Sequence, residues 1–114
     1  MCGTSVEELL GLEWREHAGN PLIAPPFPSP IIADPTFLPP DDTPDGLWHL
    51  FAHSMLGIHH FTSRDGLAWE RLAGAVCRAS LRAFLLKRDG TYHLFYERFL
   101  RLFPFAYRSR LEMR

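Results

Sequence analysis

DGLWHLFAH (residues 45–53) and DGTYHLFYE (residues 89–97) are two copies of one pattern, 44 positions apart. They share an aspartate, a glycine, an aromatic residue, a histidine, a leucine and a phenylalanine in register. The segments before them also match, because Thr36-Phe37-Leu38 corresponds to Ala83-Phe84-Leu85 at a spacing of 47. A repeat of about 40 to 50 residues built from short strands is typical of β-propeller blades.

The repeated strand is apolar on both faces. Alternate residues of a strand point to opposite faces, and here Trp48, Leu50 and Ala52 share one face while Phe51 lies on the other. The second copy has aromatic or aliphatic residues at all four corresponding positions. A sandwich strand normally leaves one face polar, whereas a blade is covered by a neighbour on each side. The pattern therefore favours a propeller.

Short apolar segments separated by turn signals continue from residue 31 to the end of the chain and predict an all-β fold. The dipeptides Asp45-Gly46, Asp65-Gly66 and Asp89-Gly90 are turn signals, because glycine adopts positive φ and aspartate caps or tolerates the turn. Strands are expected at residues 31–38, 47–53, 58–63, 68–72, 82–87, 91–97 and 107–113. The expected architecture is about two four-stranded antiparallel blades of a five-bladed propeller.

The first 30 residues have a different character. A short helix is expected over residues 5–17, with Ser5 or Thr4 as its N-cap and Gly19 as its end. Nine of the ten prolines lie before residue 45, and those in residues 20–30 exclude a helix there. We therefore divide the chain into a helix and proline-rich strap (1–30) and two blades (31–114), the second of them incomplete.

Composition is that of one small globular domain. The 114 residues are 46% hydrophobic and 22% charged, and no apolar run approaches the roughly 18 residues of a membrane-spanning helix. The first 17 residues carry four glutamates in place of a basic signal-peptide segment, which predicts a cytoplasmic protein with no membrane partner. Cys2 and Cys77 are too few for a disulfide framework and are expected to be free thiols.

The net charge of −1 conceals an asymmetry. Residues 1–45 contain eight acids and one base (−7), and residues 46–114 contain five acids and eleven bases (+6). A basic second half is one feature of nucleic-acid-binding proteins, but its arginines are interleaved with apolar residues and no stacking motif or helix-turn-helix pattern accompanies them. Attraction between the two halves, within one fold or between subunits, is the favoured interpretation, and no nucleic-acid partner is expected.

With these features the sequence resembles the five-bladed β-propeller glycosidases typified by glycoside hydrolase family 43. The resemblance covers roughly residues 20–97. It rests on the lead-in NPLI (20–23), the strand ADPTF (33–37), the strand at 46–53 and the turn SRDGLAW (63–69). Residues 82–97 resemble the start of a second blade. The resemblance implies hydrolysis of glycosidic bonds.

It also implies that Asp34 is the general base that activates water. A carboxylate before proline is expected to be held extended at the end of a strand beside the central cavity. In the inverting mechanism a second carboxylic acid, roughly 6.5 to 9.5 Å away, protonates the departing oxygen. The alternative for Asp34 is a simple turn-forming aspartate before proline.

The sequence departs from the family at the remaining carboxylates. Where the family has an aspartate in the first strand of its second blade, this chain has Leu81-Arg82-Ala83. Glu97 is a candidate catalytic acid from its place at a strand end, and an ion pair with Arg98 or Arg82 is its alternative role. Asp34 and Glu97 are therefore the candidate catalytic residues.

No cofactor and no metal site are expected. His49 and His93 recur at one position of the repeat, which favours a hydrogen bond between strands over metal ligation. His59 and His60 are neighbours on a strand and point to opposite faces, so they cannot easily share an ion. The aromatic residues are interpreted as core, with a sugar-stacking platform as the alternative.

Two blades leave exposed blade faces, which must be covered to avoid aggregation. Three explanations are open: the chain is a fragment of a longer enzyme, it forms a homo-oligomer through its blade faces, or its opening helix folds back over a face. Self-association is the favoured one. Two functions follow, a glycosidase-like protein and a non-catalytic carbohydrate-binding or self-assembling module.

Overall fold

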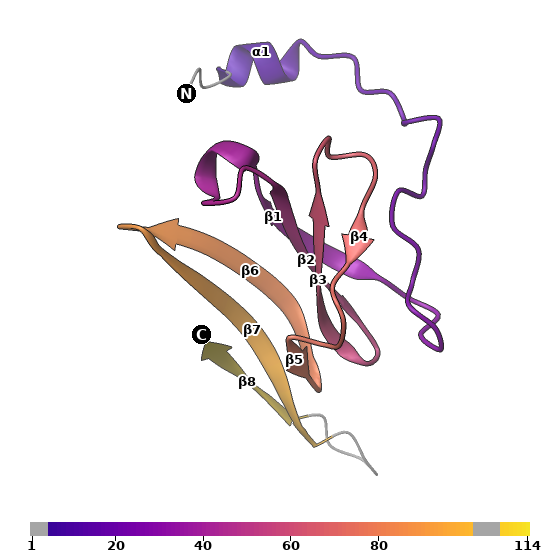
Figure 1. Ribbon diagram of the computed structural model, residues 1–114, viewed down its shortest axis with the longest axis vertical. Helices are drawn as coiled ribbons and strands as arrows, with labels where there is room; N and C mark the ends of the chain where they lie inside the picture. Colours follow the sequence, from indigo (N-terminus) through magenta and orange to yellow (C-terminus); the bar gives the residue numbers. More distant parts are fainter. Residues whose placement is uncertain (1–4, 102–107) are drawn as a thin grey trace.

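The computed structural model describes residues 5–101 and 108–114, and most of these residues form two antiparallel β-sheets (Figure 1). The first sheet has the order β1-β2-β3-β4, and β5 pairs with the same strand, β3, as β4 does. Its strands are β1 (Ala33–Leu38), β2 (Trp48–Ser54), β3 (Gly57–Ser63), β4 (Glu70–Arg71) and β5 (Cys77–Arg78). The second sheet has the order β6-β7-β8, with β6 (Ser80–Arg88), β7 (Thr91–Arg101) and β8 (Arg108–Met113). The predicted all-β fold is confirmed, and within the described residues neither sheet closes on itself.

The Asp-Gly dipeptides form turns, as predicted. Asp89 and Gly90 connect β6 to β7 with φ angles of 50° and 74°, the two positive values that a two-residue type I′ hairpin requires. At the second dipeptide the Asp65 carboxylate accepts hydrogen bonds from the backbone N–H groups of Leu67 and Ala68, 2.8 and 2.9 Å away. These turns fix where each strand begins.

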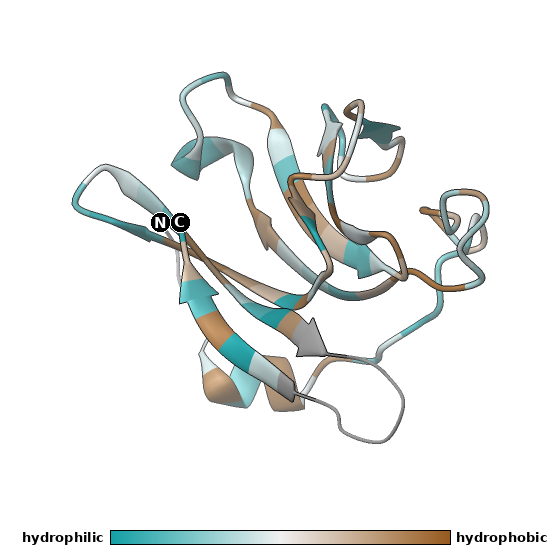
Figure 2. Ribbon diagram, turned by 90° about the horizontal axis from the view of Figure 1, so that it is seen from below, coloured by the Kyte–Doolittle hydropathy of each residue, from teal (hydrophilic) through white to brown (hydrophobic). Residues whose placement is uncertain are grey.

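The strand predictions were close in the centre of each strand and less accurate at the ends. β4 contains two residues where five were expected, and β5 was not predicted. β8 begins at Arg108, and Tyr107 lies outside the described residues. Figure 2 shows hydrophilic and hydrophobic residues alternating along β8, because Leu111 and Met113 lie on one face and Arg110 and Glu112 on the other.

The predicted helix over residues 5–17 is mostly wrong, because α1 covers only Val6–Leu10. Ser5 caps it, with the Ser5 side chain and Glu8 forming a capping box, and Gly11 ends it. The side chains beyond this turn have nothing to pack on: Leu10 is 82% exposed and Trp14 77%. An isolated helix of this length needs tertiary packing to extend, and α1 stands away from both sheets (Figure 1). It does not cover a face of either sheet.

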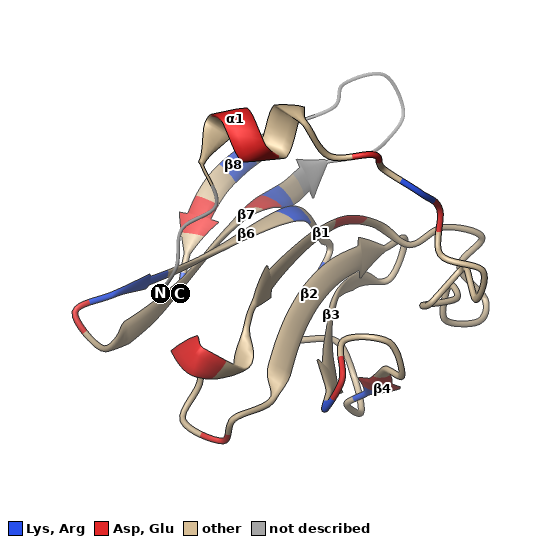
Figure 3. Cartoon of the chain, turned by 90° about the horizontal axis from the view of Figure 1, so that it is seen from above, with Lys and Arg blue, Asp and Glu red and all other residues tan. Residues whose placement is uncertain are grey.

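The proline-rich strap, residues 20–30, contains no helix or strand, as predicted. Ser29 anchors it, because the Ser29 hydroxyl oxygen accepts a hydrogen bond from the Met55 N–H at the β2–β3 turn, 3.1 Å away. Figure 3 shows acidic residues on α1 and on the 3-10 turn at Pro40–Asp42, and basic residues concentrated on the sheet of β6, β7 and β8. The two halves meet where Lys87 and Tyr92 donate hydrogen bonds to the Asp42 carbonyl.

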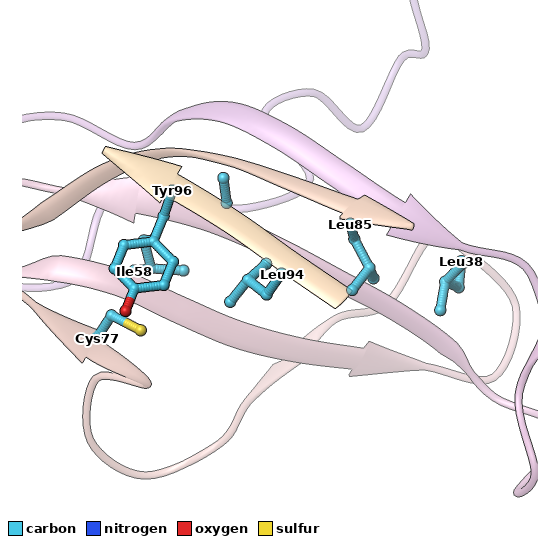
Figure 4. Packing of buried hydrophobic residues seen from close by; sticks show 7 residues of the cluster. Leu38, Ile58, Cys77, Leu85, Leu94 and Tyr96 are labelled. Atoms are coloured by element: carbon cyan, nitrogen blue, oxygen red, sulfur yellow. The ribbon is translucent and has the colours of Figure 1, made fainter. Parts of the chain in front are cut away.

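The main core lies between the two sheets, where β6 packs against β1, β2 and β3. In Figure 4, Leu38 and Ile58 of the first sheet approach Leu85 and Leu94 of the second. Ile58 is fully buried, and burying a side chain of this size stabilises a fold by about 1.5–3 kcal/mol. Phe51 packs against the same cluster.

A second cluster lies on the opposite face of the first sheet. Leu50, Ala52 and Phe61 are buried there beneath Ile23 and Ile32 of the N-terminal segment. The first sheet is therefore apolar on both faces, as the repeated strand predicted.

Candidate functional site

Two bulges of the same form occur near the starts of β1 and β6. The strand register shifts between Ala33 and Thr36 in the first sheet, and between Leu81 and Phe84 in the second. Within these bulges Asp34 has a φ of 50° and Arg82 a φ of 51°, a left-handed conformation that is uncommon for residues other than glycine. The extended backbone expected for Asp34 before proline is therefore wrong.

The bulges define how the two sheets correspond. Ala33 pairs with His53 as Leu81 pairs with Glu97, so the first strands correspond at a spacing of 48. This corrects the spacing of 47 inferred from sequence, where Phe37 was matched to Phe84: by strand pairing Phe84 corresponds to Thr36, and Phe37 corresponds to Leu85. Arg82 therefore occupies the place of Asp34, and Glu97 occupies the place of His53.

Asp34 and His53 form the first pair of neighbouring polar side chains. The Asp34 Oδ2 lies 3.6 Å from the His53 Nδ1, and the side chains are 56% and 6% exposed. The same Nδ1 accepts a hydrogen bond from the backbone N–H of Arg82, 3.2 Å away. An imidazole nitrogen that accepts is unprotonated, so the neutral ring carries its proton on Nε2. His53 thereby links the first sheet to the bulge of the second.

Arg82 and Glu97 form the second pair, in which the guanidinium Nη1 donates to the Glu97 Oε2. Of the two partners that the sequence offered for Glu97, Arg82 forms this ion pair, while Arg98 is bonded to Glu112 at 2.9 Å. Relative to the first pair the acid is on the other strand. The acid lies on the first strand of the first sheet and on the second strand of the second sheet.

His53 is influenced by all three of its charged neighbours. Burial lowers the pKa of His53 below its ordinary value of 6.5 and Arg82 acts in the same direction, while Asp34 and Glu97 act in the opposite direction. The net lowering favours the neutral ring, which is the form that accepts the Arg82 N–H.

Asp34 is the member of this cluster best placed to act on a ligand. It lines a depression between β1 and β6 together with Pro35, Thr36 and Ala83. A half-exposed carboxylate reaches water and can accept a proton from it. Glu97 is held by a guanidinium, which stabilises the charged carboxylate, whereas a general acid must carry a proton. The cluster thus supplies a base without an obvious acid.

The histidines on β2 and β3 form structural contacts. His49 Nδ1 lies 2.8 Å from His60 Nε2 on the neighbouring strand, so the predicted bond between strands is confirmed at His49. His59 points to the opposite face, where it bonds to Ser54 at 2.7 Å. Within residues 5–101 and 108–114 no three potential ligands come together as a metal site.

A separate apolar groove of about 570 Å³ lies on the outer face of the first sheet. Phe37 and Trp48 form one part of it, with ring centroids 5.7 Å apart. The strap residues Leu22 and Ile23 line another part. Trp69 also lines the groove and donates to the Gly66 carbonyl. Some of the aromatic residues assigned to the core therefore line an open surface.

No protein-family model matches the chain, and no match was found among curated proteins or solved structures. In the part of the chain that the structure describes, no helix is long and apolar enough to cross a bilayer.

Sequence reasoning missed His53 as a member of this cluster, and it named Arg82 as an alternative partner of Glu97 but not as the counterpart of Asp34. A signal was present for Arg82, because a spacing of 48 between the first strands of the two sheets, in place of 47, aligns Arg82 with Asp34. Nothing in the sequence pointed to His53, whose role depends on the stacking of the two sheets.

Proposed function

We propose that this chain is a glycoside hydrolase-like β-propeller protein in which Asp34 is the general base for hydrolysis of glycosidic bonds. The observation that carries the proposal is the position of the half-exposed Asp34 carboxylate, on a bulge beside the first strand of the next sheet. Its ligand would be a carbohydrate. A cytoplasmic location and the absence of a nucleic-acid partner remain predictions from the sequence.

The propeller part of the proposal is supported by the repetition of one unit. Both sheets run in sequence order with the same register and the same bulge. They stack face to face, with the first sheet apolar on both sides. Consecutive blades have these properties, and we propose that the two sheets are the first two blades of such a ring.

In the proposed reaction Asp34 removes a proton from a water molecule as the water oxygen bonds to the anomeric carbon. The bond from that carbon to the departing oxygen breaks, and a carboxylic acid protonates this oxygen, which leaves as an alcohol. Glu97 was the candidate for the acid. Its ion pair with Arg82 favours a structural role, so we propose that the acid lies outside the two described sheets.

Hydrolysis of aryl arabinosides and aryl xylosides, followed by release of the chromophore, tests the proposal. Asp34→Asn should lower kcat by about 100-fold or more, since a positioned general base contributes on this order. Asp41→Asn is the matched control, because Asp41 is an exposed aspartate on the 3-10 turn. Absence of turnover in the wild-type chain, or an unchanged rate in Asp34→Asn, would overturn the assignment.

The second candidate is a non-catalytic carbohydrate-binding module. It is favoured by one observation, the replacement of a second-blade carboxylate by Arg82 and the engagement of that arginine with Glu97. Trp48 and Trp69 line the apolar groove, so sugar binding there should change tryptophan fluorescence. A saturable change that Asp34→Asn leaves intact, with no hydrolysis, would favour this candidate.

A further inference from the structure

The outer face of the second sheet is apolar and exposed. Phe84 and Leu86 on β6 are 59% and 39% exposed, and Leu111 and Met113 on β8 are 75% and 57% exposed. The half-buried Phe95 on β7 lies between them, because it pairs with Phe84 on one side and with Met113 on the other. Contiguous apolar surface of this kind commonly marks an interaction site.

This face repeats a surface that is already buried inside the chain. By strand register Leu86 corresponds to Leu38, Phe95 to Phe51 and Leu111 to Ile58. In the first sheet these three residues contribute to the core between the two sheets. The second sheet thus presents outward the same arrangement that the first sheet presents to it.

The complementary surface is also repeated. Within the chain the first sheet packs on four residues of the second sheet, and register gives each a counterpart in the first sheet. The counterparts of Ala83, Leu85, Leu94 and Tyr96 are Pro35, Phe37, Leu50 and Ala52. All four counterparts line the apolar groove on the outer face of the first sheet, where Phe37 is 56% exposed.

We infer that the chain binds a second copy of itself head to tail. The outer face of the second sheet of one copy packs on the groove of the first sheet of the next and continues the stacking found within each copy. Ile23 lies over Leu50 and Ala52, which are 9% and 2% exposed, and lines the groove with Leu22, so the incoming face packs on these strap residues as well as on Phe37. The inference goes beyond the proposed function and does not depend on the chemistry of Asp34.

A head-to-tail contact generates a ring if its rotation closes and an open filament if it does not. Each copy contributes two sheets, so a closed ring holds an even number of them. Propellers commonly contain about four to eight blades, which corresponds to two, three or four copies.

Light scattering coupled to size exclusion measures the mass directly. The wild-type chain should elute at two, three or four times 13.1 kDa, or as a filament. Leu111→Glu and Phe84→Glu, which place a charge on the outer face of the second sheet, should each reduce the mass to that of one chain. Met55→Glu is the control, because Met55 is 68% exposed at the β2–β3 turn, away from both surfaces.

A mixing experiment tests which two surfaces meet. Phe37→Glu blocks the groove and Leu111→Glu blocks the opposite face, so each variant alone should be a monomer. A mixture of the two retains one working pair of surfaces and should form a 1:1 dimer that grows no further. Circular dichroism like that of the wild type verifies that both variants are folded, with Phe84→Glu replacing Leu111→Glu if that variant is not.

Three results would each overturn the inference. The first is a wild-type chain that remains monomeric up to about 100 µM, a concentration at which weak contacts are populated. The second is a mixture that remains monomeric. The third is an oligomer that Phe37→Glu leaves intact, because the groove would then not be the partner surface.

Discussion

His53 joins the two sheets through a single nitrogen. Its Nδ1 accepts the Arg82 N–H across the interface, and its side chain is almost completely buried. When a partly buried backbone N–H loses its acceptor, the folded chain loses the stabilisation from that hydrogen bond, and hydrogen bonds to water restore only part of it. The contribution of His53 to stability should therefore exceed that of its ring packing.

Replacing the ring by one without an acceptor tests this. His53→Phe should lower the free energy of unfolding by about 1–2 kcal/mol, the usual effect of removing one partner of a buried hydrogen bond. Urea denaturation measures the change. His17→Phe is the control, because His17 is exposed and its ring accepts a hydrogen bond from the nearby Gly19 N–H. Equal stability of the two variants would contradict the role given to His53.

At this scale the sequence identified Asp34 and Glu97 as candidate residues, but not their conformations or the partner of Asp34. Proline at position 35 indicated extended backbone, whereas the bulge places Asp34 at positive φ. This geometry depends on the bulge and on the packing of one sheet against the other, which the backbone preferences of single residues do not predict. The ion pair of Glu97 with Arg82 is one of the two pairs that the sequence offered for Glu97.

At the scale of elements, the β2–β3 hairpin depends on Gly57. Its φ is 127°, and a Cβ atom at this position would lie 2.2 Å from the Cys77 carbonyl oxygen. Gly57 also pairs with Arg78, so β5 approaches β3 closely at this point. Only glycine permits both the conformation and the approach.

Gly57→Ala should therefore destabilise the chain by more than about 2 kcal/mol, because strain at positive φ adds to a backbone clash. Gly46→Ala provides the comparison: Gly46 has a φ of 70° with nothing within 4 Å of an added Cβ, and its loss should be limited to about 1 kcal/mol. Thermal unfolding followed by circular dichroism gives both values. Similar melting temperatures for the two variants would show that the close approach does not matter.

The elements that sequence placed correctly are those with two concordant signals. β2, β3, β6 and β7 have apolar patterning bounded by turn residues, and all four lie within a few residues of the prediction. The predicted helix reached residue 17 because its apolar pattern continued to there and Gly19 was taken as its end, but the helix ends at Leu10, where no surface packs against that pattern. β5 contains only Cys77 and Arg78, too short a segment for any periodicity.

At the scale of the whole molecule, several histidines are buried between or upon the sheets. Burial lowers the pKa values of His53, His59 and His60 below the ordinary 6.5. Arg71 acts in the same direction at His59, and His49 does so at His60. The folded chain therefore holds these rings neutral at pH values where the unfolded chain begins to protonate them.

The free energy of unfolding should fall as pH decreases. Between the lowered pKa values and about 6.5 the unfolded chain binds more protons than the folded one, so stability is lost as pH drops through this window. Backbone hydrogen bonds lower the pKa of Asp65 below 3.8, and its contribution is lost only at lower pH. Urea midpoints at pH 7.5, 6.5 and 5.5 measure the trend, and a flat profile over that range would contradict it.

The sequence predicted the two stacked sheets correctly, because the repeat and its two apolar faces express the same packing requirement. The closure into a ring that we propose does not follow from the repeat in the same way. It depends on exposed residues such as Leu111 and Phe37, which lie on the outer faces of the two sheets and not in the interface between them.

The position of Cys77 makes its reaction with alkylating reagents a measure of how often the two sheets separate. Its free thiol is 2% exposed and belongs to the cluster shared by both sheets. A thiol reacts as an accessible thiolate, so alkylating reagents reach this one only when the layers part. In a chain in which Cys2 is replaced, the rate of alkylation of Cys77 reports the rate at which the two sheets separate.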